Sequence, residues 1–315
     1  MNEAIDLHAS SAATLDTRLA RFALRDVRAG EACVSYREAS ADTASGNEAL
    51  PLVLLHGIGS GAASWVQQFE VLGGARRVLA WDAPGYGAST PVANASPIAA
   101  DYARVLRDWL DALEIERCVL VGHSLGAIIA GAFAAVHAPR VSGLLLISPA
   151  GGYGAADPQI RADKRDARLA MLAELGPQGL AQKRSANMLS PHASDAARAW
   201  VRWNMARVIP HGYAQATHLL ANADLAADLA HCAGRVPMAV AVGAEDTITP
   251  PGGCERLADV ARAPFETIAR AGHAGYIEQP DAYNTLIDTF CRTYQQNSQN
   301  SQNQQTQQTQ GSIQQ

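Results

Sequence analysis

Val119-Leu120-Val121-Gly122-His123-Ser124-Leu125-Gly126-Ala127-Ile128-Ile129 is the stretch that decides the fold of this chain. An apolar run of strand length enters a Gly-x-Ser-x-Gly sequence, which leads into a second, almost wholly apolar segment. This order predicts a buried strand, a tight turn with Ser124 at its apex, and a buried helix. The flanking glycines permit a turn too tight for side chains, and the strained backbone should push the hydroxyl out of the sheet. The start of the helix offers N–H groups and partial positive charge to a developing oxyanion.

Short apolar runs alternate with helical patterns along much of the remaining chain. The runs are rich in branched aliphatic residues and apolar on both faces, as in parallel strands covered by helices on both sides. They are Leu52–Leu55, Arg77–Trp81, Cys118–Val121, Leu144–Ile147, Met238–Val242 and Phe265–Ala269. Helical spacing appears in Asp101–Leu113 and Tyr276–Tyr294, and alternation in Arg21–Val27 and Ala32–Arg37 predicts an edge hairpin. The sequence therefore predicts an α/β fold.

The chain divides into a core, an insertion and two ends. The α/β core is expected at residues 20–150 and 230–294. Residues 151–229 contain no strand-like run and are divided by prolines, so we interpret them as an inserted helical cap. Residues 1–19 are expected to form a flexible leader. Residues 295–315 are Gln/Asn-rich, cannot bury a core and are expected to be disordered.

Composition narrows the range of partners. The 315 residues are 48% hydrophobic and carry a net charge of −5, which allows a large core. Basic residues are scattered singly, so neither nucleic acid nor a membrane is an expected partner. No signal peptide or bilayer-spanning stretch is visible, which favours a cytoplasmic location. The sequence predicts no particular oligomeric state. An odd number of widely spaced cysteines argues against disulfides and a cysteine-built metal site: Cys33, Cys118, Cys232, Cys254 and Cys291.

Three residues of complementary chemistry each follow a strand-like run: Ser124, Asp246 and His273. Ligands bind beyond the carboxyl ends of parallel strands, so these side chains should meet at one edge of the sheet. A serine is a poor nucleophile until an imidazole takes its proton, and a carboxylate must fix the tautomer of that imidazole. Each residue alone has a structural explanation. Their joint occurrence in the order serine, acid, histidine predicts a catalytic triad.

Glycine-rich loops follow the two preceding strands. In His56-Gly57-Ile58-Gly59-Ser60-Gly61, backbone amides should face the crevice, so that Ile58 or Gly59 complements Leu125 as an oxyanion donor. The alternative is a plain glycine turn before a helix, and His56 is expected to brace this loop. Asp82 begins Asp-x-x-Gly-x-Gly-x-Ser, whose spacing predicts a tight loop, and we assign the carboxylate a structural task rather than catalysis.

Taken together, these motifs resemble those of the α/β-hydrolase superfamily. The matching segments are His56–Gly59, Asp82–Ser89, Gly122–Gly126, Gly243–Asp246 and Gly272-His273. The resemblance implies an α/β-hydrolase fold with an eight-stranded, mostly parallel sheet and no cofactor. It also implies the triad named above and an oxyanion hole formed by the amides of Leu125 and Ile58.

A weaker resemblance connects the chain to 3-oxoadipate enol-lactonases and carboxylesterases. Gly243–Pro251 and the end of the cap, His211 to Leu225, look like the corresponding parts of the lactonases. The chain departs from those enzymes at His56-Gly57 and at Ala127, where a third glycine often stands.

The serine nucleophile limits the chemistry. Haloalkane dehalogenases and epoxide hydrolases of this fold attack with a carboxylate, whereas a serine forms an acyl-enzyme and requires a carbonyl substrate. The leading interpretation is a serine hydrolase that cleaves a carboxylic ester or lactone of a small, partly apolar substrate. A C–C bond hydrolase of meta-cleavage (dienoate) products is the nearest alternative. An acyltransferase and a non-catalytic ligand-binding member of the fold are alternatives of other classes.

Within the cap, Trp200 and Trp203 stand three residues apart, and Arg207 follows one turn later. One interpretation is an aromatic wall over the pocket, with the arginine holding a substrate carboxylate. The other is that these residues, and the neighbouring stripe of Val201, Met205 and Val208, only pack the cap helix.

Overall fold

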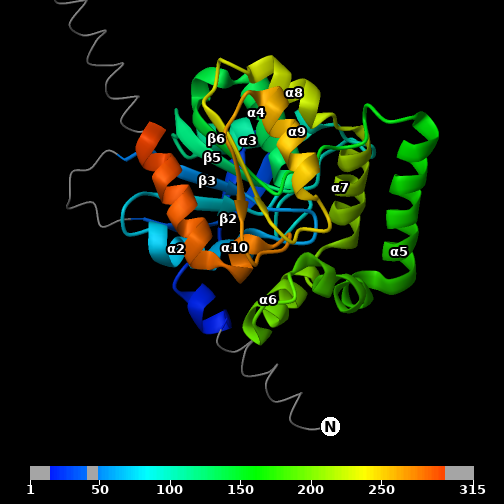
Figure 1. The fold of residues 1–315 in the computed structure, drawn as a ribbon. Coiled ribbons are helices and arrows are strands. Elements are labelled where there is room, and N and C mark those ends of the chain that lie inside the picture. The colour runs from blue at the N-terminus through cyan, green and yellow to red at the C-terminus, as the bar shows by residue number, and fades with distance from the viewer. Residues whose placement is uncertain (1–14, 41–48, 295–315) are drawn as a thin grey trace, which may run out of the picture.

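A computed structural model describes residues 15–40 and 49–294 of the chain (Figure 1). It contains one eight-stranded sheet in the order β1-β2-β4-β3-β5-β6-β7-β8. Strand β2 runs antiparallel to β1 and β4, and all other neighbours are parallel, which confirms the predicted sheet. The strands are β1 (Arg25–Ala29), β2 (Ala32–Ala39), β3 (Leu52–Leu55), β4 (Val78–Trp81), β5 (Cys118–His123), β6 (Val141–Ile147), β7 (Met238–Gly243) and β8 (Phe265–Ile268).

Helices cover both faces of the sheet. The strands β3, β4 and β5 are buried along their whole length, as their unbroken apolar sequences predict. One face packs on α3 (Ala99–Ala112), α4 (Leu125–Val136) and α9 (Pro251–Ala261). The other packs on α2 (Val66–Leu72), α10 (Gly275–Glu278) and a helix over residues 280–294. Short 3₁₀ turns complete the core at η2 (Ala62–Trp65) and η3 (Ala138–Arg140).

The position of the site follows from the strand order, which reverses at β3. Strand β3 has β4 on one side and β5 on the other, so the loops after β3 and β5 are neighbours. In open parallel sheets a ligand crevice forms at such a point, beyond the carboxyl ends of the strands. The loops after β7 and β8 open at the same edge.

The inserted segment is helical, as predicted, and stands beside the core in Figure 1. Its elements are α5 (Pro158–Arg184), η4 (Ser185–Met188), α6 (Asp195–Met205), α7 (Pro210–Asn222) and α8 (Leu225–Cys232). Pro158 and Pro210 stand in the first turns of α5 and α7, where a missing N–H costs nothing. Gly176, at φ 60°, breaks α5 into two arms just before Pro177. Helix α8 packs on α4 rather than on the cap, since Leu225 lies against Gly131.

The ends differ in part from the prediction. Residues 15–20 are helical, and Leu15 and Leu19 are buried against the core, so this part of the expected flexible leader is wrong. Arg18 forms an ion pair with Glu70 on α2, which ties the segment down further. The rest of the leader and the expected disordered tail lie outside the described residues. None of the helices in the described ranges is both long and apolar enough to cross a bilayer.

Candidate active site

Ser124 stands at the turn between β5 and α4. Its backbone adopts φ 54° and ψ −113°, a strained conformation for a residue with a side chain, which confirms the predicted tight turn. A Cβ atom at Gly122 would lie 2.6 Å from the carbonyl oxygen of Gly126, and one at Gly126 would collide with that of Leu55. Only glycine therefore fits on either side of the serine.

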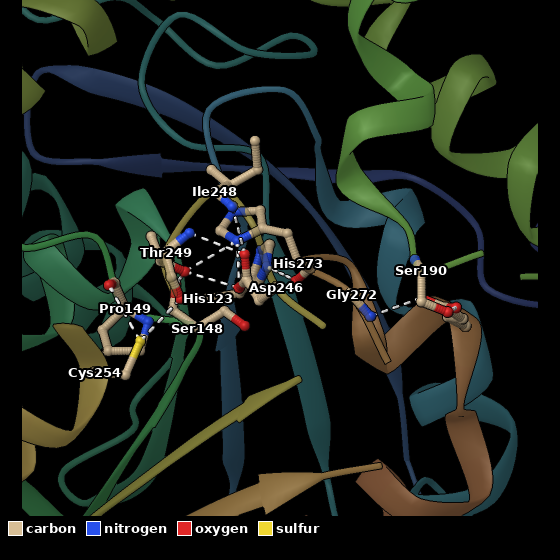
Figure 2. A network of polar contacts seen from close by, with 11 residues as sticks. His123, Ser148, Pro149, Ser190, Asp246, Ile248, Thr249, Cys254, Gly272 and His273 are labelled. Atoms are coloured by element: carbon tan, nitrogen blue, oxygen red, sulfur yellow. Dashed lines mark hydrogen bonds and ion pairs between the residues drawn. The ribbon is translucent and has the colours of Figure 1, made fainter. Parts of the chain in front are cut away.

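Asp246 and His273 form a buried ion pair in the loops after β7 and β8. His273 Nδ1 lies 2.9 Å from Asp246 Oδ2, and both side chains are almost fully buried. The other carboxylate oxygen accepts hydrogen bonds from the N–H groups of Ile248 at 2.8 Å and Thr249 at 2.9 Å (Figure 2). Burial alone would raise the pKa of Asp246, but the imidazole of His273 and the hydrogen bonds from Thr249 lower it to about 2. The carboxylate is thus ionised and fixes the orientation of the imidazole.

The second ring nitrogen of His273, Nε2, is not bound by Asp246. Because Nδ1 is held by Asp246, Nε2 is the atom left to exchange a proton with a neighbour. His273 and Ser124 line the same two pockets. Ser124 and the Asp246–His273 pair therefore lie at one site, and their action as a triad stays a prediction.

Two further histidines brace the loops. His123 Nε2 donates to the backbone carbonyl of His273 at 2.8 Å, and burial lowers the pKa of His123 to about 3, so the ring is neutral. His56 Nδ1 donates to the carbonyl of Gly57, and its Nε2 accepts the N–H of Ala83. This places His56 in the predicted bracing position between the loops after β3 and β4.

Asp82 has the surroundings of a structural carboxylate. It accepts hydrogen bonds from the N–H of Ala62 at 2.8 Å and from Ser35 Oγ at 3.0 Å. Close contact with its carboxylate requires glycine at position 87, where φ is 54°. These partners join the loop after β4 to strand β2 and to the start of η2, in agreement with the structural assignment made from the sequence.

The residues predicted to donate to the oxyanion line the same pocket as Ser124. Leu125 lies in the first turn of α4, where N–H groups have no intrahelical acceptor. The carbonyl of Gly57 accepts a hydrogen bond from the N–H of Ser60. This carbonyl and the N–H of Ile58 belong to the same trans peptide group, so the N–H of Ile58 points away from Ser60. Leu125, Ile58 and Gly59 all line a pocket with Ser124. Their role as donors stays a prediction.

The pocket has a volume of about 340 Å³ and is covered by the cap. Neither Trp200, Trp203 nor Arg207 lines this cavity or the smaller one that also contains Ser124. Trp200 is buried in the core cluster under Arg18, while the guanidinium of Arg207 stacks on Trp203 at 3.7 Å. The predicted aromatic wall is therefore wrong, because the apolar face of α6 turns toward the core. The neighbouring residues Val201, Asn204 and Met205 line the cavities instead.

Some site residues were missed by the sequence prediction. Thr249 Oγ1 lies 2.8 Å from Asp246 Oδ2 and 3.1 Å from His273 Nδ1, and its position three residues after the acid was an available signal. Glu278 accepts the N–H of Gly272 at 2.9 Å and that of Ser190, a cap residue, at 3.1 Å. It joins the cap to the loop that carries His273, and no local pattern announces it.

Comparisons with known proteins identify the family of the chain. The family profile described as "alpha/beta hydrolase fold" matches residues 51–280. The chain is 28% identical over 288 residues to 1-acylglycerol-3-phosphate O-acyltransferase ABHD5 of Rattus norvegicus, covering 77% of each protein. It is 30% identical over 261 residues to the 2-hydroxy-6-oxononadienedioate/2-hydroxy-6-oxononatrienedioate hydrolase of Cupriavidus pinatubonensis, covering 79% of this chain and 88% of that protein.

A solved structure agrees in fold. The enol-lactonase from Burkholderia xenovorans LB400 superposes with a TM-score of 0.73 at 23% identity, over 84% of this chain and 99% of that one. With its eight-stranded sheet, strained serine turn and matching family profile, the chain belongs to the α/β-hydrolase family.

Proposed function

We propose that the protein is a serine hydrolase that cleaves a carboxylic ester or lactone of a small, partly apolar substrate through an acyl-enzyme. One observation carries this proposal: the strained Ser124 and the Asp246-bound imidazole of His273 line one cavity. That combination supplies a nucleophile, a base and an orienting acid.

The reaction follows from these positions. His273 Nε2 takes the proton of Ser124 as Oγ attacks the substrate carbonyl, and the N–H groups of Leu125 and Ile58 stabilise the oxyanion. Collapse of the tetrahedral intermediate breaks the bond to the alkoxide, which receives the proton from His273. Water, deprotonated by the same imidazole, then attacks the acyl-enzyme and releases the acid and Ser124. Asp246 stays ionised throughout and stabilises the imidazolium.

The cavity fits a small substrate with apolar parts. Met188, Met205 and Leu220 contribute apolar surface, and the volume of about 340 Å³ lies at the small end of ligand pockets.

C–C bond hydrolysis is the second candidate. The relative from Cupriavidus pinatubonensis, a hydrolase of 2-hydroxy-6-oxononadienedioate and the corresponding trienedioate by name, matches the chain over most of both lengths. The acyltransferase named among the relatives favours a third possibility, in which an alcohol rather than water takes the acyl group from Ser124.

The test uses the purified protein and its Ser124→Ala variant. We expect a fluorophosphonate probe to label the wild type at Ser124 and to leave the variant unlabelled. A substrate panel of p-nitrophenyl esters, enol-lactones and dienoate ring-cleavage products then separates the candidates, and product partition between water and added alcohol detects transfer. Turnover in Ser124→Ala should fall by roughly 10⁴-fold or more. Labelling elsewhere, or equal turnover by the variant, would refute the proposal.

A further inference from the structure

Two arginines of the cap line the pocket that contains Ser124. Arg168 lies in the first arm of α5 and Arg184 at the end of the second arm, and both side chains are half-buried. Among the described residues that line this cavity, none is an aspartate or glutamate. The charged side chains on its wall are therefore basic.

These arginines make few contacts within the described part of the chain. Arg168 Nη1 lies 3.4 Å from Tyr213 Oη, and Arg184 Nη1 lies 3.9 Å from the sulfur of Met171, a weak acceptor. A guanidinium carries five N–H donors, so most of the donors on both residues are available to a ligand. Several other half-buried or buried arginines in the described ranges have carboxylate partners: Arg18 pairs with Glu70, Arg76 with Asp288 and Arg77 with Glu38.

The break in α5 brings the two arginines toward each other. Met171, which Arg184 approaches, lies three residues after Arg168 and therefore on the same face of the first arm. A continuous helix would separate residues 168 and 184 by about 24 Å along its axis. Because Gly176 takes φ 60°, the second arm can turn back, and Arg184 reaches the arm that carries Arg168.

We propose that Arg168 and Arg184 bind a carboxylate of the substrate, which would then be an ester or lactone with a free acid group at its other end. The inference rests on the proposed function, because it assigns a substrate class to the same pocket. Two like charges with unused donors in a half-buried cavity are stabilised by an anion, and the planar guanidinium matches a carboxylate with two parallel hydrogen bonds. Met188, Met205 and Leu220 leave room for an apolar linker between the acid and the scissile carbonyl.

The first experiment measures kcat/KM on matched pairs of substrates. p-Nitrophenyl hydrogen glutarate is compared with p-nitrophenyl pentanoate, which places the acid on the acyl side, and 4-carboxyphenyl butyrate with phenyl butyrate, which places it on the alcohol side. In Arg168→Gln and Arg184→Gln, we expect the anionic-to-neutral ratio to fall about 10-fold in one pair, and about 100-fold in the double variant. Arg161→Gln, on the same helix and outside the lining of this cavity, should keep the wild-type ratio. A double variant with the wild-type ratio in both pairs would overturn the proposal.

The second experiment separates this inference from the proposed chemistry. Calorimetry measures the binding of glutarate to Ser124→Ala and to Ser124→Ala combined with both arginine substitutions. Arginine-dependent glutarate binding, together with no ester hydrolysis by the protein with Ser124 intact, would retain the anion site and reject the ester-hydrolase proposal. Ester hydrolysis together with glutarate binding that is absent, or that is equal in both proteins, would reject the anion site and retain the hydrolase.

Discussion

The loops that follow β5, β7 and β8 differ from the cap helices in how completely their polar groups are paired. In the loops, the Asp246 carboxylate receives hydrogen bonds on both oxygens, and the buried His273 is held at its Nδ1 by Asp246 and at its backbone carbonyl by His123. In the cap, Arg168 and Arg184 face the pocket with most donors unused. A preorganised site stabilises the same transition state for every substrate, whereas unpaired groups select among substrates. We therefore expect substitutions in the loops to affect all substrates and substitutions in the cap to affect some.

The largest expected effect is on kcat, and it tests which carboxylate orients the imidazole. Asp246→Asn should reduce kcat by about 10⁴-fold on every substrate, because an amide cannot hold the imidazole in the productive tautomer. Glu245→Gln is the matched control. Glu245 precedes Asp246 in the sequence, but its carboxylate pairs with His192 at the surface, at a distance of 3.2 Å. Steady-state kinetics on neutral and acidic esters measure both variants. An active Asp246→Asn beside an inactive Glu245→Gln would show that the acid is Glu245.

The pairing of Asp246 should also be visible in the pH dependence of stability. The pKa of Asp246 is about 2 in the folded protein, compared with 3.8 for an ordinary aspartate such as that of the unfolded chain. The folded state therefore favours the charged form. The resulting stabilisation is present above pH 4 and is lost as the pH falls toward 2, and it amounts to about 2 kcal/mol. Urea unfolding at pH 6, 4 and 3 should show a steeper acid loss for the wild type than for Asp246→Asn. Parallel pH curves for the two proteins would contradict the assigned pairing.

A smaller effect is expected where the cap meets the loop of His273. Glu278→Gln replaces one of two acceptor oxygens with an N–H₂ group, whereas the carboxylate accepts the N–H groups of Gly272 and Ser190 on one oxygen and the Ser190 hydroxyl on the other. We expect kcat to fall about 10-fold with little change in KM, because the imidazole shifts while the pocket stays formed. Glu255→Gln, on the exposed side of α9, is the control. A rise in KM alone would indicate that Glu278 shapes the pocket rather than positioning His273.

The core could be predicted from sequence because its signals are local. The glycines around Ser124 are required by backbone contacts within a few residues or with the adjacent strand, and the strands are visible as continuous apolar runs. The cap could be predicted as helical for the same reason, from its prolines and its lack of strands. Its face could not be predicted, since the burial of Trp200 depends on Arg18 and a core cluster distant in sequence. The positions of Arg168 and Arg184 in the pocket could not be predicted either, because they depend on the break of α5 at Gly176.

The smallest expected effect concerns Arg207, which one interpretation of the sequence placed at the substrate carboxylate. Arg207 is exposed, stacks on Trp203 and donates to the carbonyl of Trp203 at 3.2 Å. Arg207→Gln should therefore cost at most about 1 kcal/mol of stability. It should change kcat/KM for acidic and neutral lactones by less than about twofold, the bound for a surface substitution remote from the chemistry. Thermal unfolding and the same lactone kinetics on Arg184→Gln complete the comparison. A selective loss on acidic lactones in Arg207→Gln, with none in Arg184→Gln, would mean that α6 rather than α5 reads the charge of the substrate.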